Sequence, residues 1–137
     1  MKNLWLVALL FFLLCVPVFA QNQETFLSSG SAFLRECSVV DKNDLTQLVE
    51  AVQKMEAMGC LSFVGGFVVG VEHERMFVKF KTKQDTPSAF CVPEDAESIQ
   101  MVRIVLKYIR DNPAEAHKPT GVLIMKALRN AYRCSSK

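Results

Sequence analysis

The stretch that decides the fold is "FCVPEDAESIQMVRIVLKYIRDNPAEAHKPTGVLIMKALRNAYRC", residues 90–134. Residues 93–95 predict a helix start, because acidic side chains suit the positive end of a helix dipole. Asn112 and Pro113 should end this helix, and Pro119 can be the first residue of the next one. The short connection predicts an all-α fold with a C-terminal antiparallel helix hairpin. Each helix carries one apolar stripe of helical period: Ile99, Val102, Val105, Leu106 and Ile109 in the first, and Val122, Leu123, Met125, Leu128 and Tyr132 in the second.

The hairpin predicts a disulfide bond. Antiparallel helices of similar length bring the start of the first beside the end of the second, so Cys91 should meet Cys134. If Cys15 is removed during export, the pair Cys37 and Cys60 follows by elimination.

The first 20 residues predict a cleaved secretory signal peptide. Lys2 is followed by an apolar run over residues 4–16, and Val18 and Ala20 place small residues before a cut. The alternative is a membrane anchor, but a spanning helix needs about 20 apolar residues and Pro17 interrupts this one. We expect a single mature domain, residues 21–137, with no stable membrane anchor.

Cleavage changes both the cysteine count and the charge. Of five cysteines four remain, and an even number in an exported chain predicts disulfides. Loss of Lys2 from the 16 basic side chains leaves 15 against 14 acidic ones, a formal charge of +1. This near-neutral charge does not predict nucleic-acid binding, because binding a polyphosphate requires a clustered stripe of basic side chains.

The N-terminal half predicts two or three further helices, making about four to five in all. A short helix over residues 29–37 has Ser28 or Ser29 available as N-cap. A second helix has its apolar period at Leu45, Leu48, Val49, Val52 and Met55. We expect it to break at residues 57–59. An unbroken helix over residues 44–70, rising about 1.5 Å per residue, would carry Cys60 more than ~20 Å from its start and beyond reach of a disulfide.

The segment "MGCLSFVGGFVVGV", residues 58–71, predicts a buried core helix, because its apolar run ends at Glu72. Gly66 and Gly70 lie four residues apart on one face, which predicts close packing of a neighbouring helix. The alternative is a strand pair over residues 67–80, since "MFVKFK", residues 76–81, alternates apolar and basic side chains.

No pattern in the sequence predicts catalysis. Four cysteines committed to disulfides leave no thiolate nucleophile. Neither His73 nor His117 has metal-ligand spacing to other ligands, so we expect no metal and no cofactor. Helix capping and solvated faces explain the acidic pairs at residues 72–74 and 94–95. The sequence therefore favours a binding protein over an enzyme.

Three motifs resemble the Rap/Tai group of type VI secretion immunity proteins: "SGSAFLREC" at residues 29–37, "CLSFVGGF" at 60–67, and the whole of 90–134. The resemblance implies an exported, disulfide-bonded, all-α protein of the Gram-negative periplasm. Family members bind and inhibit peptidoglycan amidases injected by other cells, typically as homodimers that occlude the catalytic cleft. The chain departs from the family pattern in its long segment at residues 38–59.

The connection between the last two helices is the predicted partner-binding site. We expect residues 111–118 to form a rigid elbow, tied through the Cys91–Cys134 crosslink, with polar specificity supplied by Asp111, Asn112, Glu115, His117 and Lys118. An ordinary solvated helix connection is the alternative. The alternative function is a periplasmic chaperone or stress-response protein that shields unfolded clients.

Overall fold

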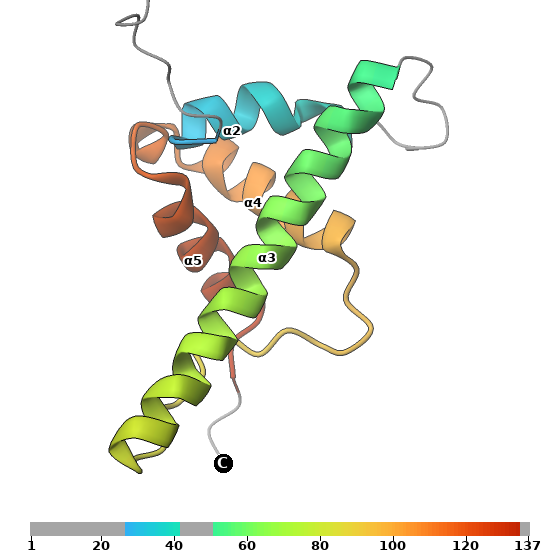
Figure 1. The fold of residues 1–137 in the computed structure, drawn as a ribbon. Helices are drawn as coiled ribbons and strands as arrows, with labels where there is room; N and C mark the ends of the chain where they lie inside the picture. The colour runs from blue at the N-terminus through green and yellow to red at the C-terminus, as the bar shows by residue number, and fades with distance from the viewer. Residues whose placement is uncertain (1–26, 42–50, 135–137) are drawn as a thin grey trace, which may run out of the picture.

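The computed structural model describes residues 27–41 and 51–134 (Figure 1). Every regular element in these ranges is helical, which confirms the all-α fold, and the only β-type contact among them is an isolated bridge between Ser29 and Pro119. The predicted signal peptide and the stripe residues Leu45, Leu48 and Val49 lie outside the described ranges. The elements are α2 (Gly30–Cys37), η2 (Ser38–Asp41), α3 (Ala51–Thr82), α4 (Ser98–Asp111), η4 (Pro113–Glu115) and α5 (Thr120–Ala131).

Helix α2 begins where the sequence predicts. The Ser29 side chain accepts a hydrogen bond from the backbone N–H of Ala32 at 3.2 Å and so caps the helix. Phe33 and Cys37 then point into the core and are fully buried. Helix α2 therefore delivers one large aromatic ring and one disulfide sulfur to the centre of the domain.

Helix α3 is one continuous helix, and it runs diagonally across the molecule in Figure 1. The predicted break at residues 57–59 is wrong, and so is the alternative strand pair at 67–80. A glycine inside a helix costs only about 1 kcal/mol, which so long an apolar segment tolerates. The helix ends at Thr82, after which Lys83 adopts a left-handed backbone (φ 58°) and donates its N–H to the carbonyl of Lys79.

The disulfide between Cys37 and Cys60 forms without that break. Its Cα atoms are 5.8 Å apart, so the pair predicted by elimination is confirmed. A break would be needed only if Cys37 lay near the start of the long helix. Instead, the end of α2 packs beside the interior of α3, where Cys60 faces inward.

Helix α4 begins at Ser98, with Glu97 as N-cap, so the predicted start at residues 93–95 is too early. Residues 93–96 form a turn, in which Ala96 N–H donates to the Pro93 carbonyl at 3.1 Å. The preceding segment is held in an extended path because Cys91 N–H donates to the Tyr132 carbonyl at 2.8 Å. Cys91 and Cys134 are joined, with Cα atoms 5.0 Å apart, which confirms the pair predicted from the hairpin.

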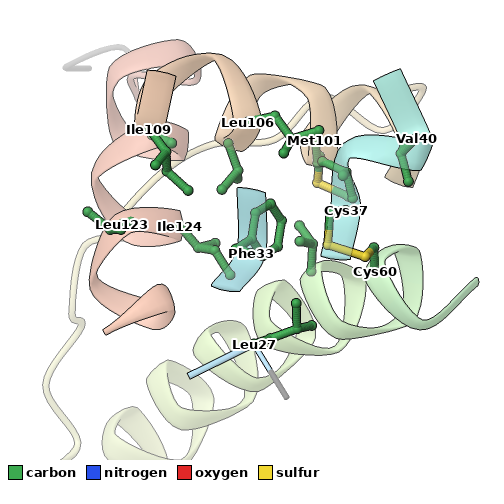
Figure 2. Close-up of a cluster of buried hydrophobic side chains, with 14 of the residues drawn as sticks. Leu27, Phe33, Cys37, Val40, Cys60, Met101, Leu106, Ile109, Leu123 and Ile124 are labelled. Carbon is green, nitrogen blue, oxygen red and sulfur yellow. A yellow bond between two sulfur atoms is a disulfide. The ribbon is translucent and has the colours of Figure 1, made fainter. Parts of the chain in front are cut away.

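The core lies between α2, α4, α5 and one side of α3 (Figure 2). Both predicted hairpin stripes contribute to it, although Val122 is 45% exposed and Ile124, which the stripe omitted, is fully buried. The largest fully buried side chains include Phe33, Leu106, Ile109, Leu123, Ile124 and Leu128.

Helix α3 is not the buried core helix that the sequence predicts. Only Ala57, Cys60 and Val64 are buried along it. A Cβ atom at Gly66 or Gly70 would meet nothing within 4 Å, so none of the helices that the structure describes packs closely there. A helix that is apolar on every side carries no periodic signal of which side faces the core.

Candidate partner-binding site

The elbow, residues 111–118, has an ordered backbone of its own. Asn112 ends α4: its N–H donates to the carbonyls of Tyr108 and Ile109, and its side-chain amide donates to the Tyr108 carbonyl at 2.8 Å. One turn of 3₁₀ helix, η4, follows. The Glu115 N–H donates to the Asn112 carbonyl at 2.9 Å and the Lys118 N–H to the Glu115 carbonyl at 2.8 Å.

The start of α2 holds the elbow from the side. Ser31 N–H donates to the Ala116 carbonyl at 2.8 Å, and Gly30 N–H donates to the Lys118 carbonyl at 3.1 Å. A Cβ atom at Gly30 would lie 2.9 Å from the Ala116 oxygen, so this close approach requires glycine. The Cys91–Cys134 disulfide joins the opposite end of the hairpin, so it can act on the elbow only through α4 and α5.

An ion-pair cluster centred on Glu115 closes the inner side of the elbow. Its carboxylate accepts hydrogen bonds from Lys126 Nζ at 2.7 and 2.9 Å, from Lys118 Nζ at 2.8 Å and from the Tyr108 hydroxyl at 3.1 Å. The bonds from Lys118 and then Lys126 lower the pKa of Glu115 to about 2. Burial, followed by the neighbouring Glu115, raises the pKa of Tyr108. Glu115 thus links the elbow to α4 and α5.

Because of this cluster, we expect the folded protein to lose stability in acid. The folded-state pKa of Glu115 lies below its ordinary value of 4.5, so its ion pairs stabilise the fold fully above about pH 4.5, and this contribution is lost as the pH falls toward 2. We expect the melting temperature of the wild type to fall more steeply across this window than that of Glu115→Gln. Thermal unfolding followed by circular dichroism measures both slopes.

The control is Glu94→Gln, which changes an exposed carboxylate that forms no ion pair among the described residues. It should keep the wild-type slope. Equal slopes for the wild type and Glu115→Gln would show that the cluster does not stabilise the folded protein.

The five side chains predicted to bind a partner divide into two groups. Glu115 and Lys118 pair with each other, and Asn112 caps α4, so these three have structural roles within the elbow. Asp111 and His117 are exposed. Among the residues that the structure describes, Asp111 pairs with Lys107 alone, at 2.7 Å, on the solvent-facing side of α4. The outward surface of the elbow also includes the exposed Pro113 and Ala114, which the sequence did not single out.

A cavity of about 600 Å³ runs along α5 from the Cys134 disulfide to Tyr108, next to the elbow. Three cations line this cavity: Lys126 and Arg129 from α5, and Arg133 from just after its end. Lys126 is neutralised by Glu115, whereas Arg129 and Arg133 form no ion pair with any residue that the structure describes. The sequence shows these three cations at spacings of three and four residues, but it does not reveal the cavity beside them. The remaining lining residues are Ser88, Ala89, Tyr108, Asn130 and Cys134.

This arrangement is suited to binding. Over residues 27–41 and 51–134, no three His, Cys, Asp or Glu side chains are grouped as metal ligands would be. The four cysteines in those ranges are all in disulfides. What the site offers is a rigid protrusion beside an electropositive hollow.

The sequence model of one protein family, the Rap1a immunity proteins, matches residues 29–134. Searches of curated proteins and of solved structures gave no match. The matched range begins at the N-cap of α2 and ends at the last cysteine, so it includes both disulfides, the whole elbow and the contacts that hold it. The chain belongs to the family of Rap1a immunity proteins.

Proposed function

We propose that this protein is a periplasmic immunity protein that inhibits a type VI secretion peptidoglycan amidase by placing its elbow over the toxin's active site. Membership in the Rap1a family implies an immunity role, which requires binding and no chemistry by the protein itself. The observation that carries the proposal is the elbow. Its backbone and inner side chains are fixed from three sides, while Asp111, Pro113, Ala114 and His117 face solvent.

Rigidity favours this role for a physical reason. A loop already ordered before binding loses little conformational entropy when it enters a cleft, so more of its contact energy appears as affinity. A convex loop also fits the concave active site of a hydrolase. Two disulfides and a predicted signal peptide agree with the oxidising periplasm, where such a toxin would act.

The cavity beside the elbow suggests what the toxin contributes. Arg129 and Arg133 offer guanidinium groups that can bind a carboxylate through two hydrogen bonds each. In the proposed complex an acidic side chain of the toxin enters this cavity while its catalytic cleft receives the elbow.

The test begins with the toxin, captured from the protein's own strain on tagged residues 21–137 and identified by mass spectrometry. The double substitution Asp111→Ala with His117→Ala should weaken toxin binding at least tenfold in calorimetry and relieve inhibition of peptidoglycan cleavage. Its melting temperature should stay within about 3 °C of wild type, because an exposed ion pair such as Asp111–Lys107 contributes only about 0–1 kcal/mol.

The matched control is Asp85→Ala with Gln84→Ala. Asp85 forms an equally exposed ion pair, with Lys79, on a loop far along the chain from the elbow. The control should bind as the wild type does. If the elbow variant also binds as the wild type does, the elbow is not the contact surface.

One observation favours the second candidate, a periplasmic chaperone. Helix α3 exposes large apolar side chains, as proteins that shield unfolded clients do. A chaperone would suppress aggregation of several unrelated unfolded proteins at low ratio, whereas an immunity protein would capture one stoichiometric partner. The homodimer implied by the family resemblance is a further proposal.

A further inference from the structure

The two disulfides differ in their access to solvent. Cys37 and Cys60 are both 0% exposed in the core, whereas Cys91 and Cys134 are both exposed at the open end of the hairpin. Thiol–disulfide exchange requires a thiolate to reach a sulfur atom, so exposed disulfides are the labile ones. The Cys91–Cys134 bond is therefore open to exchange in the folded protein, while the Cys37–Cys60 bond is protected by the core.

The cavity along α5 leads to one of the two exposed sulfurs. Cys134 lines this cavity of about 600 Å³ together with Ser88 and Ala89, which belong to the segment before α4. Its volume lies in the range of small-molecule sites, ~300–1,000 Å³. Cys134 Sγ is 3.8 Å from the Ser88 carbonyl oxygen, so the disulfide joins two walls of the cavity. A small thiol that enters the cavity thus meets Cys134.

The lining of the cavity favours an anion. Arg129 and Arg133 both line it, and Asn130 adds an uncharged amide beside them. A guanidinium binds a carboxylate through two parallel hydrogen bonds. Positive charge beside a disulfide also stabilises the thiolate that attacks and the thiolate that leaves.

Two carboxylates near the cavity do not cancel this charge, because each already has a cation of its own. Glu115 pairs with Lys126, at 2.7 Å. Glu72, which accepts a hydrogen bond from the Ser88 hydroxyl, pairs with Arg75 at 3.0 Å. The two arginines therefore set the net charge that a ligand meets.

We propose that the cavity binds a small anionic thiol, whose carboxylates contact Arg129 and Arg133 and whose sulfur attacks Cys134. A bond forms between the thiol sulfur and Cys134 Sγ, and the bond from Cys134 to Cys91 breaks. Its electron pair leaves on Cys91 Sγ, which takes up the proton that the attacking thiol lost. The products are a mixed disulfide at Cys134 and a free thiol at Cys91, and no further oxidant or reductant is consumed.

The fold is expected to survive this exchange. Cys91 N–H donates to the Tyr132 carbonyl at 2.8 Å, and this hydrogen bond does not need the disulfide. The buried Leu106 of α4 and Leu128 of α5 also hold the hairpin together from within the core. The exchange would therefore modify the cavity, in which the proposed toxin carboxylate also binds, without unfolding the domain. The inference does not depend on toxin binding.

The test incubates mature residues 21–137 with glutathione, an anionic thiol, or with cysteamine, a cationic one. Each rate is divided by that of the same thiol with bis(2-hydroxyethyl) disulfide, an uncharged reference. Iodoacetamide stops the reaction, and peptide mass spectrometry locates the products. We expect glutathione on Cys134, an alkylated Cys91 and an intact Cys37–Cys60 bond. The relative rate should be at least about fivefold higher for glutathione than for cysteamine, because exposed ion pairs of this kind are individually weak.

The double substitution Arg129→Gln with Arg133→Gln should bring the ratio of the two relative rates close to one. Its helical circular dichroism should not change, because both side chains are exposed. The matched control is Lys54→Gln with Lys81→Gln, which removes the same charge from exposed positions of α3 that do not line the cavity. This control should keep the wild-type ratio.

Three results would overturn the proposal: a wild type that shows no preference for glutathione, an adduct that forms mainly on Cys91, or an arginine variant that keeps the wild-type ratio. Toxin is absent throughout, so none of these results bears on the role of the elbow.

Discussion

Phe33→Ala is expected to lower the free energy of unfolding by about 3–5 kcal/mol. Phe33 is fully buried and lies in the centre of the core, next to the Cys37–Cys60 disulfide and facing Leu106 and Ile124 (Figure 2). Removing the ring takes away its buried apolar area and leaves a cavity that helices joined by disulfides cannot easily close. Urea denaturation measures the loss.

The matched control is Phe80→Ala, which removes the same ring from a position that is 74% exposed. It should change the free energy of unfolding by no more than about 0.5 kcal/mol. Because Phe33 anchors the helix whose start holds the elbow, Phe33→Ala should also speed amide exchange at Ser31. A small stability loss, or exchange at Ser31 unchanged from wild type, would contradict this account of the core.

The second large effect is expected from Cys37→Ala with Cys60→Ala. A crosslink closing a loop of this length, with a sequence separation of 23, contributes about 3 kcal/mol by restricting the unfolded chain. Both cysteines are also fully buried in the core, so their removal costs packing in addition. We expect a total loss of about 4 kcal/mol in the free energy of unfolding, measured by urea denaturation.

Comparison with Cys91→Ala and Cys134→Ala separates the two causes. That crosslink has the larger sequence separation, 43, but both of its cysteines are exposed. Chain entropy alone predicts the larger loss for this pair, whereas burial predicts the larger loss for Cys37 and Cys60. We expect the buried pair to matter at least as much, and a much smaller effect there would show that its packing contributes little.

The hairpin could be predicted from the sequence because its information is local. Each of its helices has one apolar stripe, and Asn112 and Pro113 mark the end of the first. Periodicity does not identify the buried side of α3, which has apolar residues on both sides: Val52 and Met55 fit a helical period but face solvent, whereas Cys60 and Val64 face the core. Periodicity shows that a helix has an apolar face, but it does not say which surface covers that face.

The sequence predicts the location of the candidate site, but only part of what its side chains do. The elbow was visible as a polar stretch between two apolar helices, and its exposed Asp111 and His117 remain predicted contacts. The structural role of Glu115 was not visible, because Lys126 is 11 residues away and reaches it across the hairpin rather than along one helix. The contact of Ala116 with Ser31 spans 85 residues, and no local pattern encodes such a pair.

Because of that long-range contact, the complete structure of the elbow depends on the folding of the whole domain. The backbone of residues 116–118 is also held by Gly30 and Ser31, near the start of the matched sequence, so its full set of hydrogen bonds requires two segments about 85 residues apart to come together. Closing so long a loop costs conformational entropy before any contact repays it, which slows the folding of domains with many such contacts. A chain that is truncated before α2 or still folding would present an elbow without these hydrogen bonds, so the complete surface is offered only by the folded domain.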